Sequence, residues 1–124
     1  MNRPKWILFI DTNGEPEFRL GRVDFHIELL PKQFSSILGG GWFDFHKDDN
    51  VFYLFHWSAD FGQVDLEDLD LLKQAISENP RPSINGAEFW FTLSSKEDYV
   101  DYIDWMMPEE SKPSIEFHKV YSPS

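Results

Sequence analysis

The chain has 124 residues, with 22 Asp and Glu against 11 Lys and Arg, no cysteine and a 17% share of aromatic residues. This length is typical of one domain, and 41% hydrophobic residues predict a packed core rather than a disordered chain. The formal net charge of −11 argues against binding to nucleic acid or to anionic membranes. The lack of cysteine excludes disulfides, zinc-thiolate sites and cysteine nucleophiles, and agrees with a cytoplasmic protein.

The N-terminal segment predicts two strands joined by a turn. The apolar run from Trp6 to Ile10 is too short for a signal sequence or a membrane span, so we interpret residues 5–11 as a strand. Asn13-Gly14 is a strong turn signal. Residues 17–29 then combine β-branched and aromatic side chains, which predicts a second strand.

A run of three glycines, 39–41, is the most unusual local feature. Pro31 fits the first turn of a short helix over 31–38, and Gly39 could end that helix in a left-handed conformation. Three consecutive glycines lose much conformational entropy on folding. They therefore indicate either a helix end with a tight turn or a backbone that approaches a ligand closely, and the residues leave both open.

Residues 42–46 and 51–57 flank a polar tetrapeptide, 47–50, and predict a β-hairpin. If His46 pairs with Val51, bulky apolar side chains lie on both faces of this hairpin. Such a hairpin should be central in its sheet and covered on both sides.

The C-terminal half predicts two helices and two strands. Asp65 can cap a helix over 66–78, which carries a stripe of leucines. The remaining elements are a strand over 87–93, a helix over 96–105 and a last strand over 114–121. We therefore expect a single α+β domain over residues 1–124, in which two or three helices pack on a mixed sheet of five or six strands.

Three segments follow one another along the chain in a characteristic order. They are Val23 to Leu29 with His26, Ile37 to Gly41, and, after the hairpin, Ser58 to Gly62. This order resembles the janus/ocnus family of small protein-histidine phosphatases. That family has an aromatic-His-x-x-apolar segment, Leu-Gly-Gly-Gly, a short hairpin and a Ser-x-x-aromatic-Gly loop. The resemblance covers residues 5–79 and leaves 94–124 as a C-terminal extension.

The resemblance implies that His26 is the catalytic histidine, either as general base on water or as acceptor of the phosphoryl group. Imidazole suits both roles because it gains and loses a proton near neutral pH, although a lone histidine in a strand is also commonly structural. Lys5, which would open the family's first strand, would place positive charge beside the phosphoryl oxygens. The implied anion-binding residues are Ser58, Ala59, Asp60, Gly40 and Gly41.

Two residues depart from the family pattern. Trp42 stands where active members have an arginine directly after the glycines, which removes a bidentate phosphate donor. Asp60 adds a carboxylate, which would repel phosphate, to the implied cradle. Arg19 or Arg22 could supply the missing cation.

Two functions follow from these observations. The first is a hydrolase of protein phosphohistidine or another phosphoramidate, whose partner is a phosphorylated protein. The second is a non-catalytic acidic protein of immunity or inhibitor type that binds a basic protein, because segments 60–70 and 98–110 combine acidic and aromatic residues. Neither function requires a cofactor or metal, since the four histidines lack zinc-binding spacing and the glycines lack a dinucleotide fingerprint.

Overall fold

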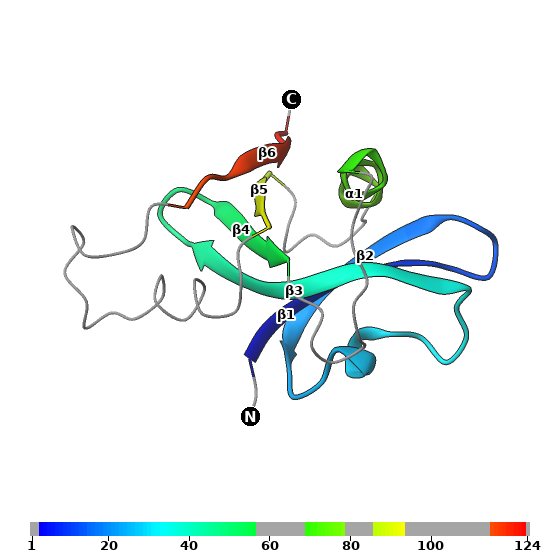
Figure 1. Cartoon of the computed structure of the whole chain (residues 1–124). Helices are drawn as coiled ribbons and strands as arrows, with labels where there is room; N and C mark the ends of the chain where they lie inside the picture. Colours follow the sequence, from blue (N-terminus) through cyan, green and yellow to red (C-terminus); the bar gives the residue numbers. More distant parts are fainter. Residues whose placement is uncertain (1–2, 57–68, 79–85, 94–114, 124) are drawn as a thin grey trace.

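The computed structural model of the chain describes residues 3–56, 69–78, 86–93 and 115–123. Six strands form one mixed sheet in the order β2-β1-β3-β4-β5-β6, in which β4 and β5 are parallel and all other neighbours are antiparallel (Figure 1). The strands are β1 (Arg3–Ile10), β2 (Pro16–Val23), β3 (Ser36–His46), β4 (Val51–His56), β5 (Glu88–Thr92) and β6 (His118–Tyr121).

The described residues also contain one α-helix, α1 (Leu69–Ser77), and one 3-10 helix, η1 (His26–Leu29). The fold is thus mostly β with a little α, and the predicted mixed sheet of five or six strands is confirmed. The described part of the predicted helix over 66–78 is also confirmed. The predicted helix over 96–105 lies outside the described residues.

The two short helices lie on opposite faces of the sheet (Figure 1). Helix α1 covers one face and contributes Leu72 and Ile76 to the main core. The other face carries η1 and a smaller cluster built on Trp42 and Phe55. The main core also contains Trp6, Leu8, Phe18, Phe43, Phe52, Leu54, Ala75, Ala87, Phe89, Phe91 and Val120.

The predicted hairpin is confirmed together with its register. His46 pairs with Val51, and Trp42 pairs with Phe55. Asn50, the last residue of the turn, has a φ of 55°, a left-handed conformation that asparagine tolerates better than most residues. Both faces of the hairpin are covered, because alternate residues enter the main core and the smaller cluster.

The second predicted strand, 17–29, is too long. Strand β2 ends at Val23, and residues 26–29 form the 3-10 helix η1. The Lys5 ammonium donates hydrogen bonds to the carbonyls of Val23 and Asp24, and these contacts hold the chain where it leaves the sheet. A β-rich composition cannot reveal this, because the partner of the two carbonyls is 18 or 19 residues away.

The predicted helix over 31–38 is wrong. Residues 31–35 are irregular, and β3 begins at Ser36 and continues through all three glycines. Gly39 therefore does not end a helix, and it pairs with Leu8 inside the sheet. The local preference of Pro31 for a helix start is overridden because pairing with β1 supplies backbone hydrogen bonds and burial over the length of the strand.

Candidate functional site

His26 is held by a tight local turn. Phe25 is extended, its N–H donates to Oε2 of Glu28 at 2.7 Å, and the Glu28 N–H donates back to the Phe25 carbonyl at 3.1 Å. This reciprocal pair satisfies backbone groups at the start of η1. As a result His26 points inward with 2% of its surface exposed, while its neighbours Phe25 and Ile27 are 61% and 71% exposed.

The imidazole of His26 contacts a backbone carbonyl. Its Nε2 lies 2.8 Å from the carbonyl oxygen of Gly41. A carbonyl oxygen only accepts hydrogen bonds, so Nε2 is the nitrogen that carries the proton. In the neutral form of the ring, Nδ1 is then the nitrogen with the basic or nucleophilic lone pair.

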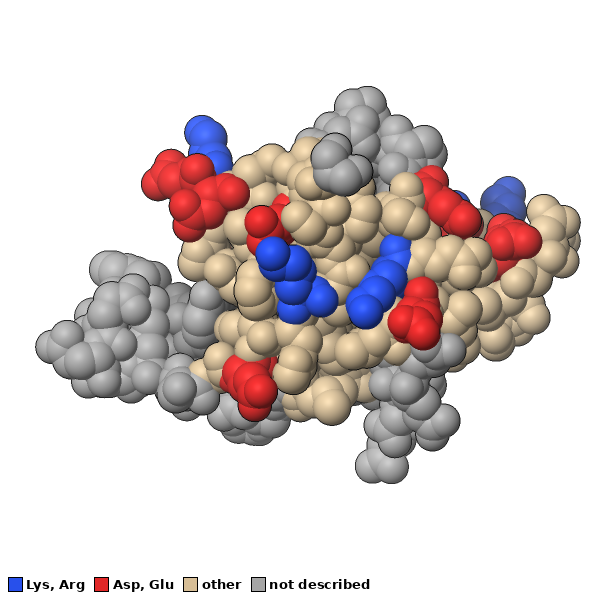
Figure 2. Space-filling view, turned by 90° about the horizontal axis from the view of Figure 1, so that it is seen from above, with Lys and Arg blue, Asp and Glu red and all other residues tan. Residues whose placement is uncertain are grey.

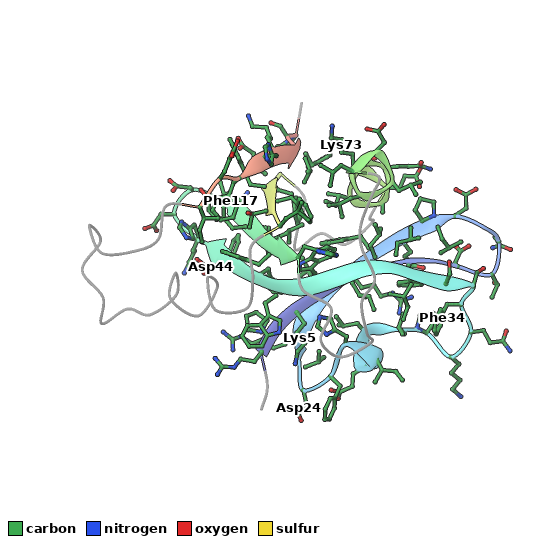
Figure 3. All side chains as sticks on the ribbon, viewed as in Figure 1. Lys5, Asp24, Phe34, Asp44, Lys73 and Phe117 are labelled. Carbon is green, nitrogen blue, oxygen red and sulfur yellow. The ribbon has the colours of Figure 1, made fainter. Side chains whose placement is uncertain are left out.

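Lys5 lies on the η1 face of the sheet, close to the turn that carries His26. Its side chain is 4% exposed, and Nζ donates to the Val23 carbonyl at 2.9 Å and to the Asp24 carbonyl. Figure 3 shows Lys5 and Asp24 on the same side of the sheet as η1. An ammonium has three N–H donors. Within the described ranges two of them are used by these carbonyls, which leaves one for a ligand.

Gly40 and Gly41 lie in the interior of β3. Gly40 pairs with Ile7 of β1, while Gly41 pairs with Trp6 on one side and His56 on the other. Their backbones are thus part of the sheet. Gly41 contacts His26 through its carbonyl oxygen, whereas the resemblance implied an anion-binding role for this residue.

The structure links His26, Lys5 and Gly41 through the pairing of β1 with β3: Lys5 pairs with Trp42, the neighbour of Gly41, and the Gly41 carbonyl contacts His26. The other three expected anion-binding residues, Ser58, Ala59 and Asp60, lie outside the described residues.

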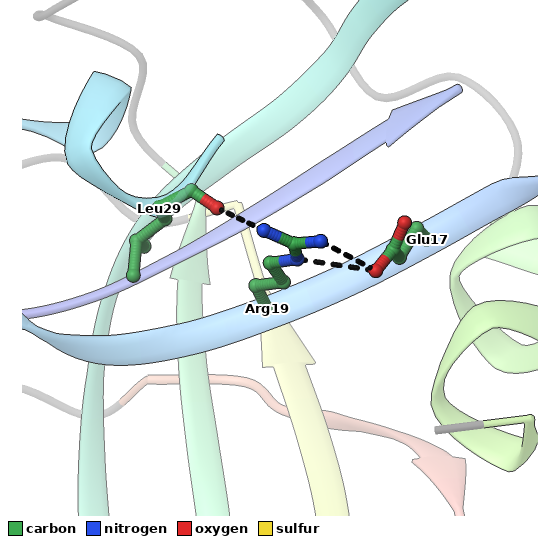
Figure 4. Close-up of polar contacts among 3 residues, drawn as sticks. All are labelled: Glu17, Arg19 and Leu29. Carbon is green, nitrogen blue, oxygen red and sulfur yellow. Dashed lines mark hydrogen bonds and ion pairs between the residues drawn. The ribbon is translucent and has the colours of Figure 1, made fainter. Parts of the chain in front are cut away.

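Arg19 does not offer an uncommitted cation. Its Nε and Nη2 donate to Oε1 of Glu17 at 3.1 and 3.0 Å, and its Nη1 donates to the Leu29 carbonyl at 3.1 Å (Figure 4). Its guanidinium also lies 5.4 Å from the centre of the Phe9 ring. Arg19 therefore ties the end of η1 to β2, and Glu17 neutralises its charge.

Arg22 lies on the other face of the sheet. Side chains alternate along a strand, so Arg22 shares its face with Leu20, which packs against the main core beneath α1. Lys5 and η1 are on the opposite face. Neither arginine considered from the sequence is therefore placed to assist His26 directly.

Sequence reasoning missed Arg3. The Arg3 guanidinium lies 5.3 Å from the centre of the Trp42 ring, and Trp42 is the cross-strand partner of Lys5. The available signal was the spacing of Arg3 and Lys5, because residues two apart in a strand share a face. The spacing alone does not reveal the contact of Arg3 with Trp42. That contact depends on the strand order, because β1 and β3 are neighbours in the sheet although β2 lies between them in the chain.

Within the described ranges no group of three or more histidine, aspartate or glutamate side chains could hold a metal ion. Among the same residues, no helix has the length and apolar character needed to cross a membrane. No family model, curated protein or solved structure matches this chain.

Proposed function

We propose that this chain is a phosphohistidine-phosphatase-like hydrolase that acts on protein phosphohistidine or another phosphoramidate. The observation that carries the proposal is the 2.8 Å contact between His26 Nε2 and the Gly41 carbonyl, because it fixes the orientation of the imidazole that the resemblance assigns as catalytic and joins it to the glycine segment. Lys5 supports it by placing a buried ammonium beside the turn that carries His26. The order of the His26, glycine and Ser58 segments adds the family resemblance.

Two routes use the same atom of His26. In the first, Nδ1 takes a proton from water while the water oxygen attacks phosphorus and the P–N bond breaks. In the second, Nδ1 itself attacks phosphorus, and water then hydrolyses the phosphohistidine formed on the protein. In both routes the P–N bond of the substrate breaks, the leaving nitrogen takes a proton from solvent water, and the third N–H of Lys5 stabilises charge on a phosphoryl oxygen.

The distribution of charge along the chain is compatible with an anionic substrate. Residues 1–34 contain five basic and five acidic side chains, so the whole formal charge of −11 belongs to residues 35–124. His26 and Lys5 lie in the neutral part. On the face that carries α1 and β6, basic side chains lie among the acidic ones and the uncharged surface (Figure 2). The repulsion expected from the net charge alone is therefore uneven over the molecule.

The burial of the site adds a step to the reaction. His26 is 2% exposed, so a phosphoryl group reaches Nδ1 only after neighbouring side chains shift. Such opening steps commonly limit turnover. We therefore expect slow hydrolysis, in which substrate entry contributes to the rate.

The test compares the wild type with His26→Gln and, as a matched control, His118→Gln. A glutamine amide N–H can still donate to the Gly41 carbonyl, but it offers no basic nitrogen, so the fold should survive while chemistry is lost. His118 is exposed on β6. Phosphate release from phosphoramidate and from a phosphohistidine peptide should fall about 100-fold or more in His26→Gln and stay unchanged in His118→Gln.

Thermal unfolding of each variant shows whether the fold is retained. The proposal is wrong if the wild type releases no phosphate from either substrate. It is also wrong if folded His26→Gln hydrolyses them at the wild-type rate.

A second candidate is a non-catalytic protein that binds a basic partner. It is favoured by the exposure of Phe25 and Ile27 and by the 17 acidic side chains in residues 35–124. The double variant Phe25→Ser/Ile27→Ser should then retain less basic protein from native lysate at low salt than the wild type. Failure of the wild type to retain any basic protein would eliminate this candidate.

A further inference from the structure

Lys5 alone provides little of what a phosphoryl group needs. A phosphoryl group carries up to two negative charges near neutral pH and has three strongly accepting oxygens. Lys5 already donates two of its three N–H groups to the carbonyls of Val23 and Asp24. A site for such a group at His26 therefore calls for a second cation with unused donors.

Arg3 has those donors. Within the described residues, its guanidinium contacts the face of the Trp42 ring at 5.3 Å, and no hydrogen bond or ion pair to it is found there. This cation–π contact uses none of the N–H groups of the guanidinium as a hydrogen-bond donor. Its five N–H groups lie in the plane of the group, so they remain able to bind two oxygens at once.

The sheet places Arg3 beside the other groups of the site. Arg3 and Lys5 are two residues apart in β1 and share a face. Trp42 pairs with Lys5, and it directly follows Gly41, whose carbonyl orients His26. The guanidinium, the ammonium and the imidazole are thus all anchored to neighbouring positions of β1 and β3.

We infer that Arg3 binds phosphoryl oxygens at the His26 site and that Trp42 is the platform that holds its guanidinium in place. This inference deepens the proposed function and rests on it for the identity of the site. Position 42, where the resembling family has an arginine, supports in this chain a cation that comes from the neighbouring strand.

The test measures binding of inorganic phosphate by titration calorimetry at fixed ionic strength, with five variants of the full chain. Arg3→Gln should weaken phosphate binding about tenfold or more, because it removes charge-assisted hydrogen bonds. Arg22→Gln changes the net charge equally on the opposite face, and it should stay within about twofold of the wild type. Arg3→Lys keeps the charge without the bidentate geometry and should fall between them.

Trp42→Leu tests the platform. It should also weaken phosphate binding. The double variant Arg3→Gln/Trp42→Leu should bind phosphate about as weakly as Arg3→Gln alone, because Trp42 acts only by holding the Arg3 guanidinium and the two losses are therefore not additive. Equal losses in Arg3→Gln and Arg22→Gln would overturn the inference, because phosphate would then sense only net charge. A wild type that does not bind phosphate would overturn it as well.

Phosphate binding and hydrolysis separate the two proposals. If phosphate binds through Arg3 but no phosphoramidate is hydrolysed, the anion site stands and the enzymatic proposal fails. If phosphoramidates are hydrolysed through His26 while Arg3→Gln changes neither phosphate affinity nor KM, the enzyme stands and the role of Arg3 fails.

Discussion

The indole N–H of Trp6 donates to the carbonyl oxygen of Phe55 at 3.2 Å, although β3 lies between the strands that carry the two residues. In register, Trp6 pairs with Gly41 and Gly41 pairs with His56, so the indole reaches β4 across the glycine. The ring centres of Trp6 and His56, the two cross-strand partners of Gly41, lie 6.3 Å apart. Gly41 suits this position in the middle of a strand because the Trp6 indole crosses the space that a side chain at residue 41 would enter.

Gly41→Ala should destabilise the protein by about 1–3 kcal/mol, because a methyl group would enter the space that the Trp6 indole crosses. The matched control is Gly21→Ala, where a Cβ would approach only the flexible tip of Leu29, at 3.3 Å. Urea unfolding measures both free energies. A loss in Gly41→Ala no larger than that in Gly21→Ala would contradict this account.

Lys5→Met should lower the free energy of unfolding by about 1–3 kcal/mol, because it leaves the Val23 and Asp24 carbonyls without their buried donor. Methionine keeps most of the apolar stem, so the loss reports mainly on the ammonium. Lys32→Met, at an exposed position, should change the stability by less than about 0.5 kcal/mol. If the two variants were equally stable, the tie between Lys5 and the end of β2 would have no energetic weight.

Tyr53 is the group for which a pH effect on stability is expected. Burial raises the pKa of Tyr53 above its ordinary value of 10.0, and the carboxylates of Asp49, Glu88 and Asp44 raise it further. The folded protein therefore binds the phenolic proton more tightly than the unfolded chain does. This contribution to stability is fully present below pH 10.0 and is lost as the pH rises through the folded-state pKa.

Tyr53→Phe removes the titrating group, so its free energy of unfolding should fall less than that of the wild type between pH about 9 and about 11. Urea unfolding at the two pH values gives this comparison. The absorbance difference between wild type and variant at the tyrosinate band should show a midpoint above 10.0. A midpoint at or below that value would refute the assignment.

Local patterns were sufficient for several elements. The apolar run at β1, the hairpin of β3 and β4 and the leucine stripe of α1 were predicted because their side-chain periodicity reflects the face that each element buries. The segment between β2 and the hairpin was predicted wrongly, as the end of a strand and a helix over 31–38. Glycines 39–41 have no side chains and therefore no periodicity, and the turn at η1 depends on contacts with Lys5 and Glu28.

The amino-acid sequence alone determined that the chain forms a mixed sheet with a two-sided central hairpin, and it singled out His26, Lys5 and the glycines as a candidate site. Only the tertiary structure decided which nitrogen of His26 carries its proton, how many donors Lys5 keeps, and which arginine lies beside them. The reason is that these properties depend on contacts between strands that are neighbours in space and distant in the chain. Pairing of β1 with β3 brings the Gly41 carbonyl and the Trp42 ring to the site, and no local pattern encodes that pairing.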